Sequence, residues 1–193
     1  MRGRMTPGRD DRCSSCLMRH EHCICNQAPT IESPVDILVI RHWKERNKPS
    51  NTARLAGIAI PNLRIVDYGA PGTQWDPKTL DIPKPALLFP DPDAPELPYE
   101  PQTVVVVDGS WPQARKLVNK LHGLNQMPRI HVPPPTHAPI RLRQPPIPGG
   151  MSTIEAIARL MDMMMGKGSG SPLDDLYKRV VEATIEARGR PLR

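Results

Sequence analysis

Residues 104–116 read VVVVDGSWPQARK, and this stretch passes from an apolar run into a basic helix within a few residues. The four valines are β-branched and suit a strand that is buried on both faces. Either Asp108 or Ser110 is suited to cap the helix that follows, and Pro112 suits its first turn. Neither role requires Trp111. Because open parallel sheets bind ligands beyond the carboxyl ends of their strands, Asp108 is a candidate functional residue.

Apolar runs and helical spacings alternate along the rest of the chain. We expect strands at 35–42, 64–68, 86–89, 103–107 and 129–132, with a further strand at 140–143. We expect helices at 51–60, 112–122 and 152–165, and a last helix from 171 to near 189. Ser152 and Glu155 have capping-box spacing at the start of the third helix. The alternation predicts an α/β domain with a mostly parallel sheet flanked by helices.

Length and composition favour one domain with a small appendage. The chain has 193 residues, of which 25 are proline, against ~5% in average usage. The prolines cluster between apolar segments, which indicates stiff loops rather than global disorder. No apolar run approaches the ~20 residues of a membrane span, and no signal segment follows the basic start of the sequence. We therefore expect a cytoplasmic protein that does not bind membranes.

The positive charge is segregated along the chain. The net charge is +6, and residues 109–154 contain no acidic residue at all. A second basic cluster, RHWKERNK at 41–48, interleaves a tryptophan with cations. Such a distribution is typical of nucleic-acid binding, although a merely solvated basic face is the alternative. The candidate RNA-binding residues are Arg41, His42, Lys44, Arg46, Lys48, Arg115 and Lys116.

All four cysteines fall within one short window. Cys13, Cys16, Cys23 and Cys25 form a C-x2-C-x6-C-x-C array, which suits one closed, structural zinc ion. Free or redox-active thiols and two disulfides are the alternatives, and nothing in the sequence indicates an oxidising compartment. His20 or His22 could replace one cysteine ligand. We expect residues 1–30 to form a cysteine-rich zinc-binding segment and residues 31–193 the catalytic domain.

Six ordered motifs together resemble the DTW-domain family, the tRNA-uridine aminocarboxypropyltransferases. They are the cysteine array, H-x2-E-x2-K-x-SNTARLA (42–56), ALLFP (86–90), VVVVDGSW-x-QARK (104–116), RLR (141–143) and MSTIEAIA (151–158). The resemblance therefore covers nearly the whole chain. The family signature is D-x-T-W, and Ser110 stands here where threonine is usual. Serine keeps the hydroxyl group, so we expect function to survive.

The resemblance implies a reaction, a co-substrate and a fold. The reaction is transfer of the 3-amino-3-carboxypropyl group from S-adenosylmethionine to N3 of a tRNA uridine, with release of methylthioadenosine. The implied fold is SPOUT-like, with a knotted C-terminal half that holds S-adenosylmethionine. We expect tRNA and S-adenosylmethionine as partners, and we expect no DNA binding.

The expected site residues follow from these motifs. Asp108 is the candidate catalytic base, which would take the N3 proton directly or through a water, or else it orients the co-substrate. Arg143 is suited to hold the carboxylate of S-adenosylmethionine, and the helix start at Ser152 and Thr153 suits an anionic group. The full expected cofactor-binding set is Leu88, Phe89, Pro90, Asp108, Gly109, Ser110, Trp111, Arg143, Ser152 and Thr153.

Two other functions fit part of these features. A SPOUT-type RNA methyltransferase would use the same co-substrate and deliver a different carbon. A non-catalytic, zinc-containing RNA-binding protein would explain the basic surface and the cysteines. It would give no reason for a carboxylate and a tryptophan at the end of a strand.

Overall fold

The computed structural model describes residues 11–91, 99–135, 140–146 and 149–189. Part of the expected zinc-binding segment, residues 1–10, lies outside the described residues, as do residues 92–98, 136–139, 147–148 and 190–193 of the expected catalytic domain. No helix among the described residues is both long enough and apolar enough to cross a membrane.

A five-stranded sheet forms the centre of the fold, with all its strand pairs parallel and the order β2-β1-β4-β3-β5. The strands are β1 (Asp36–His42), β2 (Leu63–Tyr68), β3 (Pro85–Leu88), β4 (Thr103–Asp108) and β5 (Arg129–Ile130). The helices are α1 (Thr52–Ala59), α2 (Trp111–Lys120), α3 (Thr153–Met165) and α4 (Ser171–Arg188). The predicted α/β class with a parallel sheet is confirmed.

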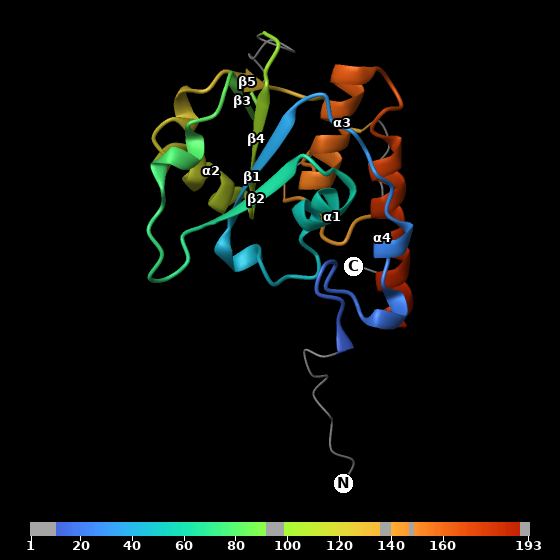
Figure 1. The fold of residues 1–193 in the computed structure, drawn as a ribbon. Helices are drawn as coiled ribbons and strands as arrows, with labels where there is room; N and C mark the ends of the chain where they lie inside the picture. Colours follow the sequence, from blue (N-terminus) through green and yellow to red (C-terminus); the bar gives the residue numbers. More distant parts are fainter. Residues whose placement is uncertain (1–10, 92–98, 136–139, 147–148, 190–193) are drawn as a thin grey trace.

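The helices cover both faces of the sheet. Helices α1, α3 and α4 lie on one face and α2 on the other (Figure 1). Alternate residues of the central strand divide between two apolar cores: Val104 and Val106 pack in the core with α1, α3 and α4, and Val105 packs with Leu117 and Val118 of α2. The valine run is therefore buried on both faces, as a central parallel strand requires.

The predicted strand at 140–143 is wrong, because these residues form a loop. Their polar groups are satisfied by side chains instead of a strand partner. The backbone N–H of Leu142 donates to the hydroxyl of Tyr177 on α4 at 3.1 Å. The guanidinium of Arg141 binds the carboxylate of Glu155 on α3. Residues 140–143 alternate between apolar and basic side chains, as a strand would. In the structure these residues form a loop that contacts α3 and α4.

The sequence leaves open whether Asp108 or Ser110 caps α2, and the structure decides between them. Ser110, not Asp108, is the N-cap of α2, and its N–H donates to Gln113 Oε1 at 2.7 Å. The predicted box at α3 is also present, since the N–H of Ser152 donates to Glu155 at 2.8 Å. Asp108 is thus not needed to start a helix.

The cysteine-rich segment packs beside α4 (Figure 1). Its short 3-10 helices, η2 (His20–His22) and η3 (Cys25–Gln27), follow the first two cysteines. Met18 and Ile24 are buried and belong to the same apolar core as α1, α3 and α4. The segment is therefore part of the packed structure and not a loose extension.

Candidate functional site

A cleft with two lobes opens at the carboxyl ends of the central strands. One lobe, of about 440 Å³, has a mixed lining that includes the charged side chains of Glu45, Asp108, Arg141 and Arg143; we call it the polar lobe. The other, of about 300 Å³, is mainly apolar; we call it the apolar lobe. Both lobes are lined by Gly109, Trp111 and the start of α3. Each of the ten residues expected to contact S-adenosylmethionine lines at least one lobe.

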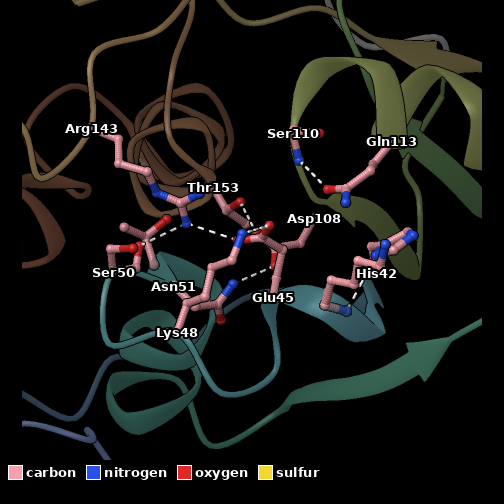
Figure 2. Close-up of polar contacts among 12 residues, drawn as sticks. His42, Glu45, Lys48, Ser50, Asn51, Asp108, Ser110, Gln113, Arg143 and Thr153 are labelled. Atoms are coloured by element: carbon pink, nitrogen blue, oxygen red, sulfur yellow. Dashed lines mark hydrogen bonds and ion pairs between the residues drawn. The ribbon is translucent and has the colours of Figure 1, made fainter. Parts of the chain in front are cut away.

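Asp108 lies at the inner wall of the polar lobe, at the last position of β4 (Figure 2). Its side chain is buried, and each carboxylate oxygen accepts one hydrogen bond. Asn51 Nδ2 donates to Oδ2 at 2.5 Å, and Thr153 Oγ1 donates to Oδ1 at 2.5 Å. Burial raises the pKa of Asp108 above its usual range, while these two donors act in the opposite direction. A carboxylate oxygen accepts more than one hydrogen bond, so the group can still take a proton.

Asn51 is the N-cap of α1, and the structure gives it a second contact. Its Oδ1 accepts from the N–H of Arg54 at 3.2 Å, which caps the helix. The amide also bridges to Asp108, which lies 57 positions further along the chain. No spacing rule in the sequence indicates this contact, because it depends on the pairing of β1 with β4.

Glu45 is a second site residue; it lies in the 42–56 motif, but no separate role was predicted for it. It is only 2% exposed, and its carboxylate binds both Lys48 and Arg143 (Figure 2). The distance from Arg143 Nη2 to Glu45 Oε2 is 2.8 Å. Burial raises the pKa of Glu45, but hydrogen bonds from Lys48 and Arg143 outweigh this effect and hold the pKa below its usual range. Glu45 therefore stays ionised and holds Arg143 at the mouth of the polar lobe.

Aromatic and apolar groups form the second lobe. Phe89 and Trp111 meet edge to face, with ring centroids 6.3 Å apart. The guanidinium of Arg129 lies over the Phe89 ring at 5.6 Å. Leu88, Pro90 and His131, which directly follows β5, complete this side of the wall. The apolar lobe therefore suits a flat, apolar group, and Trp111 separates it from the polar lobe.

The seven candidate RNA-binding residues do not all face solvent. Arg41 is buried, and its Nε donates to Asp67 at 2.7 Å. His42 Nδ1 accepts from the N–H of Lys44, and burial lowers the pKa of His42, so the ring is neutral at pH 7. The exposed cations of this set are Lys44, Arg46, Arg115 and Lys116, and Lys48 is half-buried.

The four cysteines form a cluster that could hold a metal ion. Their sulfur atoms all lie within 4.8 Å of one another, and all four cysteines are free. The Sγ atoms of Cys13 and Cys25 are 3.6 Å apart, and those of Cys16 and Cys23 are 3.8 Å apart. Zinc–sulfur bonds of about 2.3 Å in a tetrahedron give sulfur–sulfur edges of about 3.8 Å, so the spacing fits zinc. Backbone hydrogen bonding at Cys16 lowers the pKa of Cys13 to about 6. His20 and His22 are not part of the cluster.

The parallel sheet, the cleft at its carboxyl edge and the ordered motifs define the class of this protein. A sequence model of the DTW domain matches residues 10–185, so the chain belongs to the DTW-domain family.

Two curated relatives carry the same name, tRNA-uridine aminocarboxypropyltransferase 2. The Drosophila melanogaster protein is 24% identical over 175 residues, which is 82% of this chain and 68% of the relative. The Macaca fascicularis protein is 22% identical over 170 residues, which is 81% of this chain and 57% of the relative. No solved structure shows significant similarity to the chain.

Proposed function

We propose that this protein transfers the 3-amino-3-carboxypropyl group from S-adenosylmethionine to N3 of a tRNA uridine. The observation that carries the proposal is the buried Asp108 in the polar lobe of a two-lobed cleft, at the carboxyl ends of the strands of a DTW-domain sheet. The names of the two relatives support tRNA uridine as the acceptor. The exposed cations Lys44, Arg46, Arg115 and Lys116 are suited to the phosphates of an RNA.

The two lobes fit the two parts of S-adenosylmethionine. The apolar lobe, with Phe89 and Trp111, suits the adenosine portion, and the polar lobe suits the aminocarboxypropyl portion. When bound, the co-substrate supplies an electrophilic carbon next to a positively charged sulfur, which is already a good leaving group. The protein then has to place that carbon, rather than the methyl group, towards the polar lobe.

Asp108 and Arg143 have separate roles in the polar lobe: Asp108 accepts a proton, and Arg143 binds a carboxylate. Uridine N3 carries a proton at neutral pH, and Asp108 accepts that proton as the nitrogen attacks. Arg143 keeps N–H groups available besides the one that binds Glu45, and these bind the carboxylate of the transferred group. Positioning of the two reactants by the cleft supplies a large further part of the rate.

The reaction itself is tested by mass spectrometry of nucleosides. Purified protein incubated with tRNA and S-adenosylmethionine should add an aminocarboxypropyl group to a uridine and release methylthioadenosine. Release of S-adenosylhomocysteine would instead support the methyltransferase alternative. Binding of tRNA without any binding of S-adenosylmethionine in calorimetry would support the non-catalytic alternative.

A second prediction concerns Arg143. Arg143→Gln should weaken S-adenosylmethionine binding by roughly 10–100-fold, since a charge-assisted bond to a carboxylate is lost. Methylthioadenosine lacks that carboxylate, so its affinity should stay within about twofold of the wild-type value. Calorimetry with both ligands measures the difference, and Arg115→Gln, on the exposed face of α2, is the matched control. Equal losses for both ligands would contradict the carboxylate role.

A third prediction concerns the RNA surface. The combined change Lys44→Gln and Arg46→Gln should weaken tRNA binding and lower the log–log salt slope by about 0.7–0.9 for each lost phosphate contact. Lys167→Gln, in the turn between α3 and α4, is the matched control and should leave the slope unchanged. Arg41 is left out because it is buried against Asp67. An unchanged salt slope in the double variant would show that tRNA binds another surface of the protein.

Further features belong to the same proposal. We take the metal of the cysteine cluster to be zinc, the division at residue 30 to separate a zinc-binding segment from the catalytic domain, and the protein to work in the cytoplasm. A SPOUT-like knot in the C-terminal half also stays a prediction. An experimental structure that traces the whole C-terminal half tests it.

A further inference from the structure

Asn51 is a buried residue whose side chain contacts Asp108. It is 2% exposed and joins three separate parts of the fold. Its Oδ1 accepts from the N–H of Arg54 at 3.2 Å and from Arg41 Nη1 at 3.4 Å. Its Nδ2 donates to Asp108 Oδ2 at 2.5 Å.

These contacts allow one orientation of the amide. A flipped amide would turn its NH2 group towards two N–H donors and its carbonyl oxygen towards the carboxylate of Asp108. Three favourable contacts would become three unfavourable ones. The orientation is thus set by the surrounding hydrogen bonds, and the amide always presents a donor to Asp108.

The charged groups near Asp108 are already paired with other residues. Arg41 of β1 binds Asp67, and Arg143 binds Glu45. Arg141 binds Glu155 of α3. Among the described residues no cation forms an ion pair with Asp108; the charge of Glu45 opposes its ionisation, and the charge of Arg41 favours it from a distance. The hydrogen bonds that the carboxylate accepts come from two neutral donors, Asn51 and Thr153.

We propose that Asn51 is a positioning residue that keeps Asp108 aimed at the polar lobe and in its ionised form. The proposal rests on the proposed function, in which Asp108 takes the proton of the acceptor nitrogen. A direct ion pair would hold the carboxylate too firmly ionised for a base, because base catalysis favours a pKa closer to the working pH. Neutral donors hold the carboxylate in place without lowering its pKa as far as an ion pair would.

Two substitutions separate this role from helix capping. Aspartate and serine cap helices about as well as asparagine, so Asn51→Asp and Asn51→Ser both keep the cap of α1. Both remove the amide donor, and Asn51→Asp adds a like charge. Asn62→Asp is the matched control: the Asn62 amide donates to two backbone carbonyls, of Ser33 and Val35, at the amino ends of the strands, away from Asp108.

We expect both variants to raise the pH at which Asp108 titrates. Loss of a hydrogen bond to a charged group corresponds to about one to two pH units. In Asn51→Asp the two carboxylates should titrate as a coupled pair, with one step displaced further upwards. Carbon NMR of aspartate carboxyls, with the Asp108 signal assigned from Asp108→Asn, measures the titration without any assay of activity. Asn62→Asp should leave it unchanged.

The rate gives the second measurement. The acid limb of the pH–rate profile should move upwards in both variants, and the lost rate should return as the pH is raised. An Asp108 titration within about 0.3 unit of wild type in Asn51→Ser would overturn the proposal, as would a rate loss that is the same at every pH. If the wild-type protein transfers nothing to tRNA, the proposed function fails, while the NMR titration still decides the role of Asn51.

Discussion

Asp108→Asn should lower the transfer rate by ~10²–10⁴-fold while the protein stays folded, because this is the usual contribution of general base catalysis. The substitution keeps the size of the side chain. The new amide can accept from Asn51 through its oxygen and donate to the hydroxyl of Thr153, so no buried group loses its partner. It also removes a buried charge, and the melting temperature should therefore be no lower than that of the wild type.

Three measurements on this one variant separate the possible roles of Asp108. If Asp108 is the base, S-adenosylmethionine affinity is nearly unchanged and the single-turnover rate falls. If it orients the amino group of the co-substrate, affinity falls with the rate. The third role, helix capping, is already assigned to Ser110 by the structure. Transfer within about threefold of wild type at saturating substrates would contradict the catalytic role.

The pH dependence gives an independent check. Burial raises the pKa of Asp108, so the wild-type rate should fall as the pH drops through a value above the usual aspartate range. Asp108→Asn lacks that acid limb. Its rate should recover in part at alkaline pH, where uridine ionises without a base, whereas a variant impaired only in co-substrate binding should not recover. Asp76→Asn, at the exposed cap of a 3-10 helix, is the matched control and should behave as the wild type.

Local patterns in the sequence predict the elements of this fold well. The five apolar runs predicted as strands are strands in the structure. The capping boxes at Ser110 and Ser152 mark where two of the helices begin. The segment at 140–143 was predicted wrongly. Its residues alternate as a strand would, but the sequence does not show that Tyr177 and Glu155 supply its partners. Those partners come from distant helices.

The same distinction applies to the site. The place of Asp108 in the cleft could be predicted, because the end of a buried strand is a local property. The contacts of Asn51 and Glu45 could not be predicted, although both residues lie in the 42–56 motif, since each contacts a residue far away in the sequence: Asp108 is 57 positions from Asn51, and Arg143 is 98 from Glu45. Arg41 is the opposite case, in which a local pattern in the sequence is misleading. It lies in a basic run that suggests an RNA surface, yet the strand turns its side chain inward to Asp67.

Removal of the proposed zinc ion from the cysteine cluster should destabilise the protein and disturb the cleft. Met18 and Ile24 pack in the main core, and each such side chain contributes roughly 1.5–3 kcal/mol when buried. A detached segment regains conformational entropy, which offsets part of this loss. We therefore expect Cys16→Ser, or chelation in reducing buffer, to lower the unfolding free energy by about 2–4 kcal/mol and Tm by roughly 5–15 °C.

Transfer activity should fall in the same experiment, because the cysteine segment is connected to the site through Arg54. Arg54 Nη1 donates to the carbonyl of Ser15, between two of the cysteines, and its N–H donates to Asn51, which holds Asp108. Elemental analysis should find one zinc per chain in the wild type and in the control Ser14→Ala, and less in Cys16→Ser. Restoring zinc to the chelated protein should restore Tm and rate together. A metal-free protein with an unchanged Tm, or with its cysteines paired as disulfides, would show that the cluster does not hold structural zinc.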